Sequence, residues 1–319
     1  MCEGNIFSKN LKECFKYFCA NVRIVNMLSI KEQELIEKHL LDLSVPFKIK
    51  SVQTIGGGCI NSCYQIISVD GSSLFIKVNE NSNRDNFEKE KFNLEYLKNK
   101  SSLVVPDVVF LLSNEELNKV YLGLSYLERV AETNEFYFQL GVGLAELHRN
   151  TQKFYGWYED NYIGSLYQSN QQSERWSEFF ITQRLEPLVK VCFDRGMLDR
   201  MSVKTFSNLY NKIEEIFPEE PSALLHGDFW QGNRMNTTQG PAIFDAACYY
   251  GHREMDIAMG FLFGSLPDVF FEGYNSVYPL ERDFIERRDI CNLYPLLVHA
   301  VLFGMSYIYD IKSIIKKFQ

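Results

Sequence analysis

The densest cluster of side chains able to do chemistry lies in residues 224–235, with the sequence LLHGDFWQGNRM. His226, Asp228 and Asn233 fall within eight residues, directly after a short apolar run. An aspartate in such a loop can accept or orient the proton of an attacking hydroxyl group, and an amide oxygen five residues later can bind Mg²⁺. The same side chains could instead stabilise an Asx-type turn. The cluster therefore predicts either a catalytic loop for phosphoryl transfer or a polar turn.

A further aspartate favours the catalytic interpretation. Asp245 follows the short apolar strand pattern AIF and lies twelve residues after Asn233. Because Mg²⁺ prefers few carboxylates together with water and phosphate oxygens, one aspartate and one asparagine suffice as protein ligands. We therefore predict that Asn233 and Asp245 bind Mg²⁺ and that Asp228 acts on the hydroxyl group.

Two histidines and a third aspartate have structural interpretations. For His226 we expect hydrogen bonds within the loop, because phosphoryl transfer needs positioning and charge neutralisation more than a second base. Asp256, near the start of an apolar helix pattern, is expected to cap that helix or to brace the loop. His148 ends the pattern LGVGLAELH, where a histidine favours the carboxyl terminus of a helix.

A lysine and a glutamate in the first half of the chain form a second candidate pair. In the strand pattern SLFIKV, Lys77 alternates with aliphatic residues and therefore points to the opposite face. Glu90 lies on the apolar stripe of the next helix pattern, where an unpaired carboxylate would be costly. Without Glu90, we would interpret Lys77 as a solvated lysine. Because the Glu90 carboxylate needs a partner, and Lys77 on the preceding strand is the nearest candidate, we predict that the two form an ion pair. Kinase-type folds use such a pair to hold an ammonium group against nucleotide phosphates.

A glycine-rich loop, TIGGGCINSCYQI, separates two strand patterns ahead of this pair. Backbone N–H groups of glycines can approach an anion closely, which makes Gly57 and Gly58 candidates for nucleotide binding. Asn61, which stands with Ser62 in place of a later glycine of the dinucleotide-binding consensus, is a further candidate. The loop matches neither the P-loop nor the full dinucleotide-binding consensus. By itself, the segment is explained equally well by a plain tight turn.

Composition limits the class of protein. The chain has 319 residues, of which 46% are hydrophobic, enough for a substantial core and two lobes. The net charge of −8 argues against a nucleic-acid-binding protein. No apolar run is long enough to span a membrane, and the amino-terminal segment lacks the pattern of a signal peptide. Because the eight cysteines are scattered without metal-ligand spacing, we expect a reducing compartment and a cytoplasmic protein.

Two of these cysteines, Cys59 and Cys63, flank the glycine-rich loop and raise a redox question. Four residues of extended strand span about 13 Å. The Cα atoms of a disulfide lie at most about 6.8 Å apart. An internal bridge is therefore not expected. A bridge between two chains through Cys59 is a hypothesis, and the expected state is a monomer or a weak homodimer.

The order of the patterns predicts an α+β fold with two lobes. Strand patterns dominate residues 45–125, with one helix at about 85–99 and a hairpin turn at Asp70–Gly71, whereas helix patterns dominate from about 134 onward. Ser29 and Glu32 predict a capping box for the first helix. The hinge is expected near residues 126–131. The predicted division is an amino-terminal extension (1–26), a nucleotide-binding lobe (27–130) and a helical lobe with the catalytic loop and substrate site (131–319).

The motif HxDxxxxN with a later aspartate resembles that of the aminoglycoside phosphotransferase and choline kinase group, which has a protein-kinase-like fold. Longer sequence strings indicate a smaller family within this group, because they are similar to those of fructosamine kinases, also called ketosamine 3-kinases. The similarity runs from about Ile30 to about Tyr307, and CYYGHRE is its most specific segment. The strings are GGGCIN, FEKE, LGVGLAELH, NYIGSLYQSN, RWSEFF, LLHGDFWQGN, FDAACYYGHREMDIAM and LVHAVLFG.

The resemblance implies ATP- and Mg²⁺-dependent phosphorylation of a ketosamine, at O3 of a fructosamine or ribulosamine. The family's product sheds the sugar, so the reaction repairs glycated amines; the partner is a small ketosamine or a glycated lysine on a protein. By resemblance, Asp228 is the catalytic base, and Asn233 and Asp245 hold Mg²⁺. The nucleotide-binding candidates are Gly57, Gly58, Asn61, Lys77, Glu90 and Glu128. The substrate-side candidates are Trp230, His226 and His299.

The chain departs from the family pattern at several positions. Ala246 replaces the usual proline after the Mg²⁺ aspartate, and Val298 replaces an asparagine near the end. Phe229 and Gln231 differ within the loop. None of these changes removes a catalytic group, but Val298 lacks an amide on the substrate side. A kinase for another small hydroxylated amine or sugar, such as an aminoglycoside, choline or a thiosugar, is the alternative on the same fold. A non-catalytic scaffold is the alternative from another class.

Overall fold

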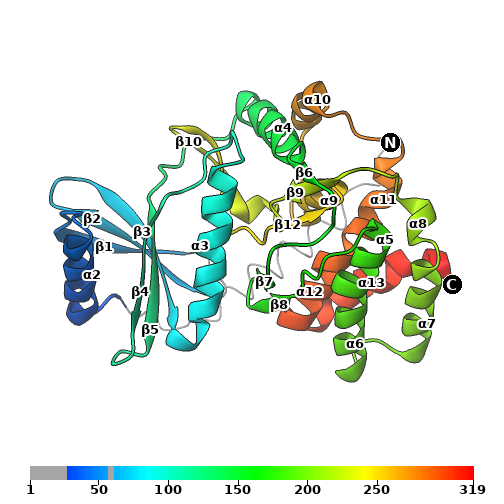
Figure 1. Ribbon diagram of the computed structural model, residues 1–319, viewed down its shortest axis with the longest axis horizontal. Coiled ribbons are helices and arrows are strands. Elements are labelled where there is room, and N and C mark those ends of the chain that lie inside the picture. The colour runs from blue at the N-terminus through cyan, green and yellow to red at the C-terminus, as the bar shows by residue number, and fades with distance from the viewer. Residues whose placement is uncertain (1–26, 57–60) are drawn as a thin grey trace.

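The computed structural model describes residues 27–56 and 61–319 (Figure 1). A β-sheet lies at one end of the molecule and helices form the larger end, with the helix α3 (Arg84–Lys98) between them. The predicted α+β class is confirmed. The predicted extension and the residues Gly57, Gly58 and Cys59 lie outside the described part of the chain.

Five antiparallel strands form the sheet in the order β1-β2-β3-β5-β4. The strands are β1 (Ile49–Ile55), β2 (Ser62–Ser68), β3 (Ser73–Glu80), β4 (Val108–Asn114) and β5 (Lys119–Ser125). The predicted hairpin joins β2 to β3. Gly71 has a φ of 91°, which favours glycine, and the Asp70 carboxylate accepts a hydrogen bond from Ser72 N at 2.9 Å.

The two faces of the sheet are buried against different cores. Helix α2 (Ile30–Asp42), which begins with the predicted capping box of Ser29 and Glu32, covers one face. The aliphatic side chains of β3 lie in this core, as their alternation predicted; they are Leu74, Ile76 and Val78. The opposite face carries Lys77 toward α3, whose apolar stripe consists of Phe87, Glu90, Leu94 and Leu97. The sheet therefore directs Lys77 toward the helical part of the molecule.

Helices packed around a second core make up the larger part (Figure 1). They are α4 (Asn134–His148), α5 (Trp176–Phe179), α6 (Glu186–Asp194), α7 (Arg200–Tyr210), α8 (Ile213–Ile216), α9 (Glu254–Leu262), α10 (Asp268–Val277), α11 (Phe284–Cys291), α12 (Leu293–Phe303) and α13 (Ile308–Ile315). A π-helical stretch, Phe180–Leu185, joins α5 to α6. None of the helices in the described ranges is long and apolar enough to cross a membrane.

Short strands in the helical part carry the loops of the site. One small sheet has the order β12-β9-β6, and two hairpins pair β7 with β8 and β10 with β11. These strands are β6 (Thr151–Gln152), β7 (Asn161–Ile163), β8 (Leu166–Gln168), β9 (Ser222–Leu225), β10 (Arg234–Thr237), β11 (Gly240–Ile243) and β12 (Tyr249–Gly251).

The connection from β5 to α4, residues 126–133, includes the predicted hinge. Within it, Val130 N donates a hydrogen bond to Asn236 O at 2.9 Å, and Thr238 N donates to Glu128 O at 3.1 Å. These two bonds hold the connection to β10 and to the turn after β10. In the sequence, β10 directly follows Asn233 of the catalytic-loop cluster.

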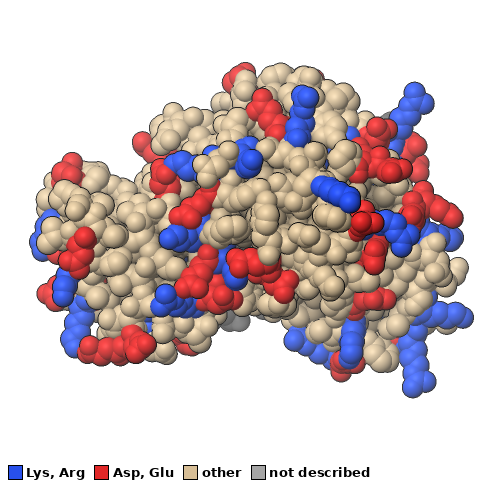
Figure 2. Space-filling model, viewed as in Figure 1, with Lys and Arg blue, Asp and Glu red and all other residues tan. Residues whose placement is uncertain are grey.

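Charged side chains of both signs alternate over the face of the molecule shown in Figure 2. At the boundary between the sheet and the helices, Lys89 Nζ of α3 lies 2.7 Å from Glu159 Oε2. Tyr162 OH in β7 donates a hydrogen bond to Asp85 Oδ2 at 2.8 Å. Polar contacts therefore link α3 to the segment around β7.

Candidate active site

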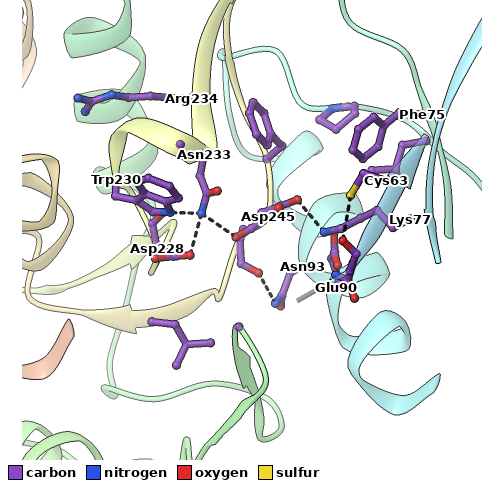
Figure 3. Close-up of a pocket in the computed structure, with 18 of the residues that line it drawn as sticks. Cys63, Phe75, Lys77, Glu90, Asn93, Asp228, Trp230, Asn233, Arg234 and Asp245 are labelled. Carbon is purple, nitrogen blue, oxygen red and sulfur yellow. Dashed lines mark hydrogen bonds and ion pairs between the residues drawn. The ribbon is translucent and has the colours of Figure 1, made fainter. Parts of the chain in front are cut away.

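The predicted ion pair between Lys77 and Glu90 is confirmed, and a third group joins it. Lys77 is only 4% exposed, and its Nζ lies 2.7 Å from Glu90 Oε1 and 2.9 Å from Asp245 Oδ1 (Figure 3). Burial alone would lower the pKa of Lys77, but the charges of Asp245 and Glu90 outweigh it and raise the pKa. The ammonium group is therefore charged and held between two carboxylates.

The catalytic-loop cluster leaves β9 through a glycine that no other residue could replace without strain. Gly227 has a φ of 81°, and a Cβ there would lie 2.0 Å from Ala247 O. The backbone N–H groups of His226 and Gly227 donate to the Asp256 carboxylate at 2.7 and 2.9 Å. Of the two alternatives predicted for Asp256, the structure therefore confirms the brace of the loop. The N-cap position of α9 is taken by Arg253, which makes no side-chain cap.

Both histidines of this region are buried in the hydrogen-bond network. His226 is fully buried; its Nε2–H donates to Phe244 O at 3.0 Å, and its Nδ1 accepts from Asp228 N at 3.3 Å. Because the backbone occupies both ring nitrogens, the geometry favours the loop-bracing role of His226 over substrate contact. His148 donates from Nε2 to Asp256 at 3.2 Å, a role that its place at a helix end did not indicate.

Asp228, Asn233 and Asp245 lie close to one another and line the same cavity (Figure 3). Asn233 Nδ2 donates to Asp228 Oδ2 at 2.7 Å and to Asp228 O at 3.0 Å. Because both bonds use the amide nitrogen, the Oδ1 atom of Asn233 is left for another partner. Burial, together with the nearby charge of Asp245, raises the pKa of Asp228 to about 7, although the bond from Asn233 opposes this shift.

The donor set of this site fits Mg²⁺. It combines the amide oxygen of Asn233 with the carboxylate of Asp245, beside a lysine that can face phosphates, and hard oxygen donors are what Mg²⁺ requires. Within residues 27–56 and 61–319, no group of three or more His, Cys, Asp or Glu side chains is arranged to hold a metal ion. The donors therefore suit an ion that takes most of its ligands from water and phosphate.

A cavity of about 680 Å³ lies between the sheet and the helical part. Its described lining contains three acidic residues, Glu90, Asp228 and Asp245. Apolar and aromatic side chains form the wall on the helical side; they include Trp230, Val298, Leu302 and Phe303. The cavity is large enough for a nucleotide and a small substrate.

The remaining nucleotide-side candidates are placed differently from one another. Asn61 lines the cavity, and its Oδ1 accepts from Asn79 Nδ2 at 2.6 Å. The side chain of Glu128 is exposed and does not line the cavity, and its carbonyl oxygen already accepts from Thr238 N. Its neighbours Leu127 and Arg129 do line the cavity, whereas the Glu128 carboxylate lies outside it.

The substrate-side candidates Trp230 and His299 both line the cavity. A Cβ at Gly232 would lie 2.1 Å from Trp230 Cη2, so glycine there lets the indole lie against the backbone. His299 Nδ1–H donates to Pro295 O at 2.7 Å, and burial lowers the pKa of His299 to about 4. The ring is therefore neutral near pH 7, with Nε2 as a hydrogen-bond acceptor.

The sequence analysis did not identify two buried residues that line the cavity, Asn93 and Arg234. Asn93 Nδ2 donates to Ala246 O at 3.0 Å. The guanidinium group of Arg234 lies over the ring of Phe229, and burial lowers the pKa of Arg234 to about 10. In Figure 3 its side chain points away from Asp245. Only the spacing of Asn93, one helical turn after Glu90, could have pointed to it.

The fold and the site together define a phosphotransferase with two lobes and a kinase-like arrangement of lysine, catalytic loop and second aspartate. The model of the fructosamine kinase family matches residues 31–319. A protein named "probable ketoamine kinase" from Vibrio parahaemolyticus is 36% identical over 89% of this chain and 96% of its own length. The chloroplastic protein-ribulosamine 3-kinase of Oryza sativa subsp. japonica is 33% identical over 91% of this chain and 85% of its own length.

A solved structure gives the same result. The crystal structure of a "putative fructosamine-3-kinase" from Haemophilus somnus matches with a TM-score of 0.79 at 26% identity, covering 89% of this chain and 96% of that one. The chain belongs to the fructosamine kinase family. It has the protein-kinase-like fold and is a phosphotransferase with an alcohol group as acceptor, as the sequence resemblance implied.

Proposed function

We propose that this protein uses ATP and Mg²⁺ to phosphorylate O3 of a ketosamine such as a fructosamine or ribulosamine. The observation that carries the proposal is the position of Lys77 Nζ between Glu90 and Asp245, beside Asp228 and Asn233 in one cavity. The names of the relatives, ketoamine kinase and protein-ribulosamine 3-kinase, support this substrate class.

Each charged group then has a role in phosphoryl transfer. Asp228 orients the attacking hydroxyl group and accepts its proton, and Asn233 keeps this carboxylate in place. Lys77 contacts the phosphates, with Glu90 fixing its direction. Asn233 and Asp245 would hold Mg²⁺, which neutralises phosphate charge when bound. Asn61, which lines the cavity, would face the phosphates from the sheet side, and Gly57 and Gly58 stay sequence-based candidates for the same role.

The wall of the cavity favours a substrate with at most one positive charge. All three acidic residues of the described lining belong to the phosphoryl-transfer machinery, so no further carboxylate is available there for a polycation such as an aminoglycoside. Trp230 offers an apolar face to a sugar ring, and neutral His299 offers an acceptor to a hydroxyl or ammonium group. A ketosamine carries one ammonium group and several hydroxyl groups, which matches this wall.

Membership of the fructosamine kinase family supports a wider role. In that family the phosphorylated product sheds the sugar, so the reaction would release the amine and repair glycated small molecules or lysines in the cytoplasm. We propose a monomer or weak homodimer. A redox link through Cys59 stays a hypothesis, and non-reducing electrophoresis after peroxide treatment tests it; an unshifted monomer band would exclude it.

The test is ATP consumption with Mg²⁺ on a panel of ribulose-lysine, fructose-lysine, choline and an aminoglycoside. We expect turnover of a ketosamine followed by loss of the sugar. Turnover of choline or the aminoglycoside alone would retain the kinase chemistry and refute the ketosamine assignment. No turnover of any of the four would count against the whole proposal.

Substitution of the proposed base separates chemistry from binding. Asp228→Ala should lower kcat by about 10³-fold or more while ATP affinity changes little, because Asp228 acts on the hydroxyl group. Asp42→Ala, on the exposed end of α2, is the matched control. Substantial turnover by Asp228→Ala would show that the loop does not supply the base.

A further inference from the structure

Helix α3 contacts both parts of the molecule through two different stripes. The stripe that contains Glu90 faces the sheet and Lys77. The other stripe contains Asn86, Asn93 and Tyr96, which recur at helical spacing, and it faces the helical part. There Asn86 Nδ2 donates to Gly164 O at 2.8 Å, and Tyr96 OH lies 3.0 Å from Tyr250 OH. The rotation of α3 is therefore fixed from both sides.

One residue of the second stripe reaches the active site. Asn93 lies about one turn after Glu90 on the helix. It is 2% exposed and donates from Nδ2 to Ala246 O at 3.0 Å. Figure 3 shows this amide directed at the backbone that follows Asp245. A side chain of α3 therefore holds the peptide next to the proposed Mg²⁺ ligand.

That peptide follows a residue in an unfavourable conformation. Asp245 has a φ of 58°, in the left-handed region. Such a conformation costs a non-glycine residue about 1 kcal/mol or more unless its surroundings hold it. Two hydrogen bonds hold the backbone directly after Asp245. Ala247 N donates to His226 O at 2.9 Å, and Ala246 O accepts from Asn93 Nδ2 at 3.0 Å. These bonds keep the Asp245 carboxylate directed at Lys77.

The net contribution of the Asn93 amide to stability is small, because its two polar atoms act in opposite directions. Asn93 Oδ1 is buried and has no hydrogen-bond partner among the described residues. A buried polar atom without a partner costs about 1–3 kcal/mol, which offsets the stability that the bond from Nδ2 to Ala246 O provides. The bond that the amide makes to Ala246 O is therefore its distinctive contribution.

We propose that Asn93 is a positioning residue for phosphoryl transfer. It couples α3, which carries Glu90, to the backbone of Asp245, so that one helix sets both carboxylates that hold Lys77. Loss of the bond lets Asp245 turn away from the place where it would hold Mg²⁺. The inference rests on the proposed function, because it concerns the same lysine and the same Mg²⁺ ligand.

The test compares Asn93→Leu with Asn99→Leu, an exposed asparagine at the end of the same helix whose amide donates to Glu95 O. We expect kcat of Asn93→Leu to fall by about tenfold or more, because a misplacement of about 1 Å at the reacting groups can cost about a hundredfold in rate. Titration calorimetry measures the Kd of ATP with and without Mg²⁺. The gain in affinity that Mg²⁺ provides should shrink by about fivefold in Asn93→Leu and stay unchanged in Asn99→Leu.

A double variant checks the route of the effect. Asn93 is proposed to act through the two carboxylates that hold Lys77. In that case the fold-loss of kcat in the double variant Asn93→Leu/Glu90→Gln should be smaller than the product of the fold-losses in the two single variants. Fully multiplicative losses would overturn the coupling.

Two further results would overturn the proposal. One is a folded Asn93→Leu variant whose kcat and Mg²⁺ effect both stay within about twofold of the wild type. The other is an equal loss of ATP affinity with and without Mg²⁺, together with a lower Tm, which would mark a purely structural residue. If Asn93→Leu does not fold, Asn93→Ala, which adds no bulk, is judged by the same criteria. A wild type without turnover would refute the proposed function instead.

Discussion

Replacement of Asp256 by asparagine tests whether one buried carboxylate holds the catalytic loop. Asp256 is 1% exposed and accepts hydrogen bonds from His226 N at 2.7 Å, Gly227 N at 2.9 Å and His148 Nε2 at 3.2 Å. Asparagine preserves the shape but converts one acceptor oxygen into an NH₂ group. At least one of these buried backbone N–H groups therefore loses its partner.

The expected cost follows from these bonds. A buried donor without a partner costs about 1–3 kcal/mol, and the remaining bonds weaken because the acceptor is no longer charged, so the total is about 3 kcal/mol. An unfolding entropy of about 2.1 cal/mol/K per residue over the 319 residues gives about 0.67 kcal/mol/K. The Tm of Asp256→Asn should therefore fall by about 4–5 °C.

Scanning calorimetry measures this change, and kcat is measured on the same preparation. We expect kcat to fall by about tenfold or more, because the loop carries Asp228 and a small displacement of a reacting group is costly. Asp268→Asn, exposed in the first turn of α10, is the matched control. A Tm within about 1 °C of the wild type with unchanged kcat would refute the bracing role of Asp256.

Two further predictions concern single residues of the site. Gly227→Ala should lower the free energy of unfolding by about 2 kcal/mol or more. The reason is that the new Cβ would lie 2.0 Å from Ala247 O at a φ of 81°; an unchanged urea midpoint would show that the loop relaxes freely. His299→Gln should reduce the acid sensitivity of the fold. Because burial lowers the pKa of His299 to about 4, the unfolded chain binds a proton below about pH 6.5 that the folded chain does not, and stability falls as the pH decreases through this range. At about 1.36 kcal/mol per pH unit, the loss from this residue between pH 6.5 and 5 is about 2 kcal/mol. Urea unfolding at about pH 7.5 and pH 5 should show a difference that is smaller by this amount in His299→Gln, and equal differences would contradict the prediction.

Local patterns in the sequence were sufficient to predict the ion pair of the sheet lobe. The two-residue period of β3 placed Lys77 away from the aliphatic face, and the helical period of α3 placed Glu90 among apolar neighbours. The period of each element follows from its backbone geometry, and the need to bury apolar side chains determines which face is apolar. The pairing followed because the two elements are adjacent in the chain and Glu90 required a partner.

Local patterns could not show how distant segments meet. Asp245 is 168 residues from the lysine that it contacts, and Asn93 is 153 residues from Ala246. No periodicity encodes such distances, because they depend on how the sheet lobe packs on the helical part. For the same reason, the resemblance could name Glu128 as a nucleotide-side candidate without showing that its side chain is exposed in the folded chain.

Residue types at short fixed spacings were enough to predict the class of the fold, the hairpin and capping signals, the catalytic-loop cluster and the family. Packing of separate elements was needed to place Lys77 between two acids, to bring Asp256 under the loop and to connect Asn93 to the backbone beside Asp245. These contacts form only in the folded chain, since hydrogen bonds and ion pairs require their partners within about 3 Å.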